Sequence, residues 1–371
     1  MGSPHEPGNG CGHQQQADNP TQGYRDASGC VRTQRCCFER QELFPCAERR
    51  RRLTSQPTRQ GQAHGAHEDG KRQSQTCCRN DANQRSPPRH GKSVPAQAGN
   101  VTDMPMAANR ADVFVKRNAS APAGFFAAEA AGLNWLAVEG GVPCVPVIGY
   151  DATSLTLQRL HPVAPTAQAA RIFGQQLAHT HDSGASAYGA GPDGYEGAGF
   201  FGPMSQPLPM SLAHHDSWGT FYTDERLRPM AQLAAGRLRA EAQDAIAAVA
   251  DLCCAGVFDD DDGPARLHGD LWSGNVMWTA DGGVLIDPAA HGGHRETDLA
   301  MLALFGFPFL DDVLAGYQSV RPLREGWRAR VDLHQLYPLL AHVALFGGGY
   351  AGQAEAAAQR VLVYGSKLRI E

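Results

Sequence analysis

The sequence predicts an α+β fold with two lobes, a small N-lobe built on an incomplete sheet and a larger, mostly helical C-lobe, behind a disordered leader. Three observations indicate this fold. The first hundred residues hold few apolar side chains, an alternating strand followed by a helical stretch begins near Asp112, and helical patterns surround a polar hairpin at 267–287. We expect the leader at 1–105, the N-lobe with its hinge at 106–160, and the C-lobe with the hairpin at 161–371.

The predicted leader differs from the rest of the chain in composition. Residues 1–100 contain 15 Lys and Arg against 9 Asp and Glu, whereas the remainder contains 18 against 29. Only eight of these hundred residues are Ile, Leu, Val, Phe, Met, Trp or Tyr, so the segment cannot bury enough apolar surface to offset its chain entropy. Its seven cysteines show neither a Cys-x-x-Cys pair nor zinc-like spacing, which leaves disorder as the expectation.

Composition also excludes several classes of partner. No stretch approaches the ~20 apolar residues of a membrane span, and no hydrophobic signal-peptide core precedes the cysteines. We therefore expect a cytoplasmic protein with no membrane partner. The basic run Arg49–Arg52 lies among Gln, Gly and Pro, which is typical of a solvated segment, so we expect no nucleic-acid partner. The oligomeric state is left open.

The most informative segment is the polar hairpin, which reads LHGDLWSGNVMW, then the turn ADGG, then VLID. Asp270 precedes Asn275 by five positions, and Asp287 follows the return strand. The protein-kinase loop HRDxxxxN has the same interval, in which Asp accepts the substrate hydroxyl proton and Asn holds Mg²⁺. Asp287 falls where the kinase DFG aspartate would be. Turn formation alone would not require this ordered set, which indicates a phosphotransferase with a protein-kinase-like fold.

The N-lobe pattern agrees with this interpretation. The predicted strand ends on Lys116, and Glu129 follows in the helical stretch at 125–138. A strand lysine paired with a helix glutamate positions an ammonium group on the nucleotide phosphates in kinases. By position alone, Gln158, Arg159 and Leu160 would form the hinge, whose backbone would bind adenine.

Several helices and turns are predicted in the C-lobe. We expect a helix over 167–181 with Ile172 facing inward and His181 interacting with the dipole at its end. We also expect one long helix at 229–253, an exposed turn at 259–262, and three helices after Leu310. His291 and His294 raise the idea of a zinc site, but the sequence offers no third ligand at suitable spacing.

From Asp112 to about Gly365 the chain resembles the fructosamine/ketosamine kinase family, relatives of the aminoglycoside phosphotransferases. The resemblance lies in VFVK with FFAAEAAGLNWLA, WGTFYTDERL, LHGDLWSGNVMW, LIDPAAHGGHRETDLAMLALFG and QLYPLLAHVALFGGGY. It implies ATP-dependent phosphorylation of the sugar 3-hydroxyl of a ketosamine, free or linked to a protein lysine, which contributes to deglycation. The implied roles are catalytic base for Asp270, Mg²⁺ ligands for Asn275 and Asp287, phosphate anchor for Lys116 and its partner for Glu129. Implied substrate contacts are His268, Trp272, His294 and Glu296.

Two alternatives stay open. The acceptor could be another small hydroxylated molecule, such as an aminoglycoside or an amino alcohol. The chain could also be a non-catalytic remnant, because the glycine turn that covers the ATP phosphates in the family is not found before the VFVK strand.

Overall fold

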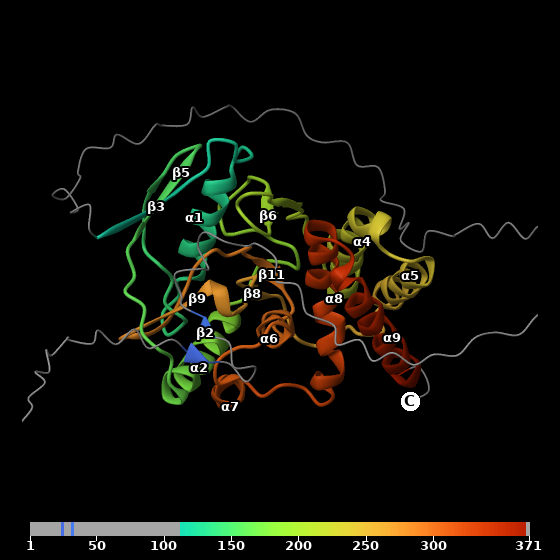
Figure 1. Ribbon diagram of the computed structural model, residues 1–371. Coiled ribbons are helices and arrows are strands. Elements are labelled where there is room, and N and C mark those ends of the chain that lie inside the picture. Colours follow the sequence, from blue (N-terminus) through green and yellow to red (C-terminus); the bar gives the residue numbers. More distant parts are fainter. Residues whose placement is uncertain (1–23, 26–30, 33–111, 369–371) are drawn as a thin grey trace, which may run out of the picture. The chain divides into compact units, whose positions relative to one another are not determined.

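The computed structural model describes residues 24–25, 31–32 and 112–368 (Figure 1). The chain divides into two units, residues 1–67 and 68–371. In the first unit, β1 (Tyr24–Arg25) pairs antiparallel with β2 (Val31–Arg32). Apart from these short strands, the predicted leader lies outside the described residues. The residues directly before the VFVK strand, where the family has its phosphate-covering glycine turn, also lie outside them.

The second unit has the two lobes of a protein-kinase-like fold. Its N-lobe sheet has the order β3-β5-β4, formed by β3 (Val113–Arg117), β4 (Val147–Tyr150) and β5 (Ser154–Gln158), with antiparallel pairs. Helix α1 (Phe125–Leu136) lies beside this sheet (Figure 1). Phe126 and Leu133 of α1 share a buried cluster with Leu155 and Leu157 of β5. The predicted strand and helix are therefore confirmed.

The hairpin of the C-lobe is hydrogen-bonded to the N-lobe segment that precedes β4. It comprises β9 (Val276–Thr279) and β10 (Gly282–Leu285), which pair antiparallel after a 3₁₀ turn, η4 (Ser273–Asn275). The amide of Val145 donates to the carbonyl of Leu285 at 3.0 Å, and the amide of Leu285 donates to the carbonyl of Pro143 at 2.8 Å. These bonds fix the end of the hairpin, and with it Asp287, against the segment that enters β4.

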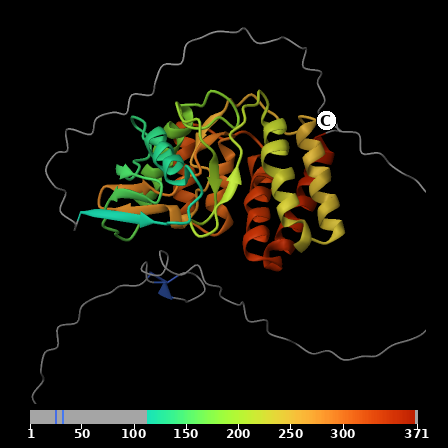
Figure 2. The same cartoon turned by 90° about the horizontal axis from the view of Figure 1, so that it is seen from above.

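Helices form most of the C-lobe. Helix α2 (Ala167–Asp182) packs closely on α7 (Leu310–Val320), because glycines let the two backbones approach: a Cβ on Gly174 or Gly316 would come within 2.0 Å of a carbonyl of the other helix. A second group, α4 (Arg228–Ala234), α5 (Ala240–Cys254), α8 (Trp327–Phe346) and α9 (Ala351–Leu368), shares one core and stands together in Figure 2.

The remaining elements connect these groups. They are β6 (Gly199–Phe201), β7 (Leu208–Met210), α3 (Trp218–Phe221), one turn of π-helix η2 (Tyr222–Leu227), the 3₁₀ turns η3 (Ala235–Arg237) and η5 (Gly348–Tyr350), β8 (Ala265–Leu267), β11 (His291–Gly293) and α6 (Glu296–Leu304). Strands β8 and β11 pair antiparallel beside the catalytic loop. No helix in the part of the chain that the structure describes is both long and apolar enough to cross a membrane.

Two predictions about helices were wrong. The single helix predicted at 229–253 is interrupted by η3, after which Leu238 takes an extended backbone with ψ of 142° and is buried in the core, so the chain turns before α5 begins. Ile172 was predicted to face inward but is 41% exposed, whereas Phe173 and Leu177 of the same helix are buried. The three helices predicted after Leu310 are present as α7, α8 and α9.

Candidate active site

A lysine held between two carboxylates lies where the N-lobe meets the hairpin. The Nζ atom of Lys116 on β3 donates to Oε1 of Glu129 on α1 at 2.6 Å and also to Oδ1 of Asp287. The side chains of Lys116 and Glu129 are 10% and 7% exposed. Desolvation opposes the lysine charge, but the carboxylates of Asp287 and Glu129 raise the pKa of Lys116 above its usual value. The predicted pairing of Lys116 with Glu129 is therefore present, and Asp287 joins it.

Asp287 reaches this lysine from a strained backbone. Its φ is 56°, in the left-handed region that non-glycine residues seldom occupy. Hydrogen bonds on both sides hold it there: the amide of Ile286 donates to the carbonyl of Asn275 at 3.1 Å, and that of Ala289 donates to the carbonyl of His268 at 2.9 Å. Such a strained backbone persists only where surrounding contacts hold it in place, and this is common in active sites.

Asp270 and Asn275 contact each other inside the catalytic loop. Nδ2 of Asn275 donates to the carbonyl of Asp270 at 2.8 Å and to its Oδ2 at 3.1 Å. Desolvation raises the pKa of Asp270 to about 7, with further contributions from the nearby carboxylates of Asp287 and Asp298, although the bond from Asn275 lowers it. A carboxyl group with a pKa near neutrality is well suited to accept a proton.

The side chain of His268 binds backbone groups of the protein through both ring nitrogens. Its ring is buried, Nε2–H donates to the carbonyl of Ile286 at 2.9 Å, and Nδ1 accepts the amide of Asp270 at 3.2 Å. These bonds fix one tautomer, and burial lowers the pKa of His268, so the ring is neutral. The substrate contact predicted for His268 disagrees with this geometry, because both ring nitrogens already serve the loop backbone.

A residue that the sequence analysis missed, Asp298 on α6, anchors the catalytic loop. Its carboxylate is fully buried and accepts the amides of His268 at 2.8 Å and Gly269 at 2.9 Å. His181 on α2 donates to the same carboxylate at 3.2 Å and accepts the hydroxyl of Tyr317 at 2.9 Å. His181 therefore supports the loop rather than only ending its helix, which corrects the prediction. The available signal was an acid directly before the apolar run LAML.

The segment after β11 is buried rather than open to an acceptor. His294 and Glu296 are each 3% exposed. Nε2 of His294 donates to Asp260 at 3.1 Å, and Glu296 accepts two bonds from Arg330 at 2.6 and 2.8 Å. The predicted substrate contacts of His294 and Glu296 disagree with this burial, since their polar atoms meet protein groups instead.

The prediction of an exposed turn at 259–262 is only partly correct. Asp262 accepts Nε of Arg295 at 2.6 Å and pairs with Arg321 at 3.1 Å, and the side chain of Asp260 is only 6% exposed. Asp260 and Asp262 thus form an ion-pair hub, whereas Asp259 and Asp261 are exposed, as predicted. Four successive acids carry no periodic signal, and their arginine partners lie more than 30 positions away.

The sequence raised a zinc site at His291 and His294, but the structure groups His294 with Glu296 and with His334 on α8, and His291 is not part of this group. Ligand atoms of His294, Glu296 and His334 lie within 4.8 Å of one another. However, the guanidinium of Arg330 already neutralises Glu296, and Nδ1 of His334 bonds Thr297 at 3.0 Å. We therefore describe the cluster as a buried ion-pair network.

The predicted hinge contributes its backbone to the sheet. The amide of Gln158 donates to the carbonyl of Pro146, and that of Arg159 donates to the carbonyl of Asp112, each at 2.9 Å. These two amides are therefore engaged. Adenine would have to use the carbonyl groups of the hinge or the amide of Leu160.

Trp272 lies in the catalytic loop and is half-buried. Its amide donates to the carbonyl of Asp270 at 3.2 Å, and its carbonyl accepts the amide of Asn275 at 2.9 Å. Its ring covers Gly274, where a Cβ would stand 2.3 Å from the indole. The contact of Trp272 with substrate stays a prediction.

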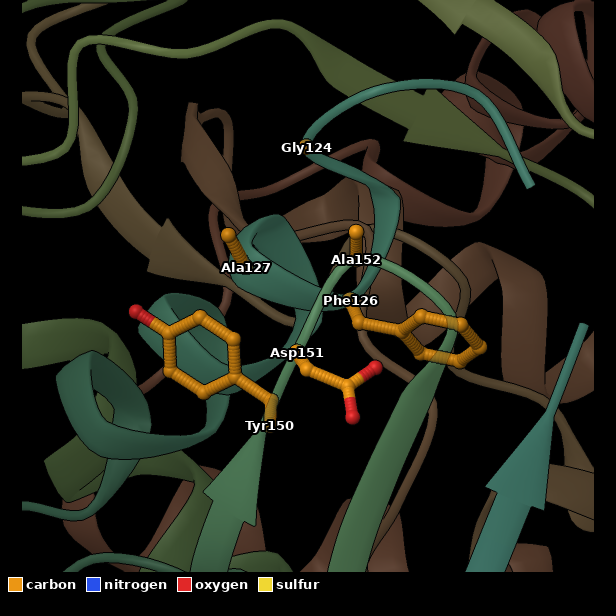
Figure 3. A pocket seen from close by; sticks show the side chains of 6 residues that line it. All are labelled: Gly124, Phe126, Ala127, Tyr150, Asp151 and Ala152. Carbon is orange, nitrogen blue, oxygen red and sulfur yellow. The ribbon is translucent and has the colours of Figure 1, made fainter. Parts of the chain in front are cut away.

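Surface hollows lie elsewhere. One, of about 190 Å³, is formed by residues from the start of α1 and the β4–β5 turn, including Phe126, Tyr150 and Asp151 (Figure 3). It contains none of the predicted site residues. The candidate site is therefore defined by the convergence of its side chains.

The chain belongs to the fructosamine kinase family, whose model matches residues 76–364. This match begins upstream of the described N-lobe. The fold and the site thus define a kinase, a phosphotransferase.

Relatives agree with this family. A probable ketoamine kinase of Enterococcus faecium is 32% identical over 270 residues, covering 72% of this chain and 94% of the relative. One from Synechocystis is 36% identical over 248 residues, covering 65% and 80%. A crystal structure of a Thermobifida fusca protein, provisionally assigned as a fructosamine-3-kinase, shares 45% identity with a TM-score of 0.62, covering 68% of this chain and 85% of that one.

Proposed function

We propose that the chain transfers the γ-phosphoryl group of ATP to the sugar 3-hydroxyl of a ketosamine, the adduct of a sugar with an amine or a protein lysine. The observation that carries the proposal is the convergence of Lys116, Glu129 and Asp287 beside the Asp270–Asn275 loop. The family and the ketoamine kinase relatives support the acceptor class.

The N-lobe residues would hold the nucleotide. Lys116 would bind the α- and β-phosphates as an anchored cation, and Glu129 would keep its ammonium group in place when Asp287 turns to the metal. The backbone of Gln158, Arg159 and Leu160 would bind adenine. Because Glu129 already fixes Lys116 before ATP arrives, the lysine itself needs little reorganisation at the moment of reaction.

Asp270 would act as the base. It would accept the proton of the acceptor hydroxyl while that oxygen forms a bond to the γ-phosphorus and the bond from this phosphorus to the bridging oxygen of ADP breaks. The hydrogen bonds from Asn275 would hold the Asp270 carboxylate toward the hydroxyl. Phosphoryl transfer depends mainly on such positioning and on charge stabilisation.

The residues fit a magnesium ion. Nδ2 of Asn275 donates to Asp270, which leaves its Oδ1 as a free oxygen ligand, and Asp287 offers a second carboxylate oxygen besides the one on Lys116. Hard oxygen ligands of this kind suit Mg²⁺, which usually takes one or two protein groups and the nucleotide phosphates. When bound, the ion would neutralise charge on the transferring group.

The product of this reaction would be a ketosamine 3-phosphate, which is prone to break down, and the activity would thereby contribute to deglycation. ³¹P NMR of a reaction containing Mg-ATP and fructosyl-lysine or ribulosyl-lysine tests the proposal. We expect a new phosphate monoester on the sugar. Phosphorylation of an aminoglycoside but of neither adduct would assign another acceptor, and a folded chain that phosphorylates none of them would be the non-catalytic remnant.

A further inference from the structure

A cluster of five aromatic rings, which we call the aromatic platform, extends from the catalytic loop. It consists of Trp272, Phe305 at the end of α6, His342 and Phe346 on α8, and Tyr350 in η5. Ring centroids of Trp272 and Phe305 are 6.4 Å apart, those of Phe305 and His342 are 4.8 Å apart, and His342 lies 5.3 Å from Phe346 and 5.0 Å from Tyr350.

The platform is partly open to solvent. Phe305 is 37% exposed and Phe346 is 41% exposed, whereas Phe201 and Tyr337, which also contact α8 or belong to it, are nearly buried. Neighbouring rings contact one another. An exposed aromatic surface of this kind, continuous with a candidate active site, is a common sign of a binding surface.

One end of the platform, Trp272, belongs to the catalytic loop. Trp272 lies two residues after Asp270 and is bonded through its backbone to both Asp270 and Asn275. The other end opens at Gly347–Gly349, where a Cβ on any of the three glycines would meet nothing within 4 Å. A molecule lying on the platform could therefore join a hydroxyl at Asp270 to a chain that continues into solvent.

His342 gives the platform a polar preference. Its Nδ1 bonds the carbonyl of Pro338 at 2.7 Å, so Nδ1 carries the hydrogen and Nε2 is an acceptor. Burial lowers the pKa of His342, which keeps the ring neutral. Three further aromatic rings, those of Phe305, Phe346 and Tyr350, contact the His342 ring. Aromatic faces attract an ammonium group, and the Nε2 lone pair can accept its N–H.

We propose that the aromatic platform binds the protonated amine of the ketosamine and the aliphatic chain attached to it, and that it favours adducts of a polypeptide lysine over adducts of short amines. This inference rests on the proposed function. The sugar would lie at Asp270 and Trp272, the amine would lie near His342, and the lysine methylenes would pass Phe346 and Tyr350 toward the open end.

The test compares kcat/KM for two acceptors, the fructosamine of a lysine within a short peptide and the fructosamine of methylamine. The variants Phe346→Ala and Tyr350→Ala remove rings at the outer end, and Val363→Ala, which is 59% exposed on α9, is the matched control. We expect each platform variant to lower kcat/KM for the peptide at least fivefold more than for methylamine. The control should leave both values unchanged.

Two outcomes would overturn the inference: equal losses for the two acceptors, or no loss for either. A wild-type chain that phosphorylates neither acceptor would instead refute the proposed function. His342→Leu adds a readout of charge. The comparison acceptor is an N-acyl analogue of the adduct, which carries no ammonium group. In the wild type, kcat/KM should be higher for the amine adduct than for this analogue. In His342→Leu the ratio of the two kcat/KM values should be at least fivefold smaller. An unchanged preference would exclude His342 from binding the amine.

Discussion

Replacing Asp298 by asparagine changes one atom of a buried carboxylate and keeps its shape. In the native chain this carboxylate receives three N–H donors, from the amides of His268 and Gly269 and from the ring of His181. Desolvation opposes its charge, but the bonds from His181 and the loop hold the pKa of Asp298 below its usual range. Asparagine would have to turn its NH₂ group toward at least one of these donors.

The size of the effect follows from these bonds. A hydrogen bond to a charged group contributes about 1.5–3 kcal/mol, and the substitution removes at least one. In a domain of this size, each kcal/mol shifts Tm by about 2–4 °C, so we expect Asp298→Asn to lower Tm by about 3–12 °C. The catalytic loop should also lose its fixed position, which lowers kcat more than it weakens nucleotide binding.

Thermal unfolding followed by circular dichroism measures the first effect, and phosphorylation assays measure the second. Asp244→Asn, on the exposed face of α5, is the matched control and should unfold like the wild type. If Asp298→Asn had the Tm and kcat of the wild type, the claim that Asp298 anchors the catalytic loop would be refuted.

Three further predictions concern stability. Arg330→Met leaves the buried carboxylate of Glu296 without its cation and should cost about 3–5 kcal/mol in urea unfolding; a loss below 1 kcal/mol would contradict the network. Gly316→Ala places a Cβ 2.0 Å from a carbonyl of α2 and should cost about 1–3 kcal/mol, whereas a neutral effect would show that the helices can separate. Burial lowers the pKa of both His294 and His334 from 6.5 to about 4, so below pH 6.5 the unfolded chain binds protons first. Unfolding free energy should therefore fall from pH 6.5 toward 4, by up to about 1.4 kcal/mol per pH unit for each histidine, and a flat profile would contradict their buried neutral state.

The site residues that lie close together in the sequence were the easiest to predict. Asp270, Asn275 and Asp287 lie within 18 positions, and a loop, a hairpin and a strained turn suffice to bring them together. The pairing of Lys116 with Glu129 was also predictable, because a strand followed directly by a helix in this order defines an N-lobe. The fold class followed from the same elements.

The supporting residues could not be predicted because their partners are distant in sequence. Asp298 meets His181 across 117 positions, and Arg330 meets Glu296 across 34. A histidine or an arginine on a helix looks the same whether it faces solvent or a buried carboxylate. Only packing distinguishes them, which is why His294 and Glu296 were predicted as substrate contacts, whereas the structure buries both among protein hydrogen-bond partners.

The most direct test of the central claim is ADP release from Mg-ATP, with and without a fructosamine or ribulosamine adduct of lysine, on the full chain and on Asp270→Asn. We predict adduct-dependent release by the wild type that is nearly lost in the variant, while the thermal shift produced by Mg-ATP is retained in both. Equal rates of adduct-dependent release in the two proteins would contradict the assignment of Asp270 as the base and with it the proposed mechanism.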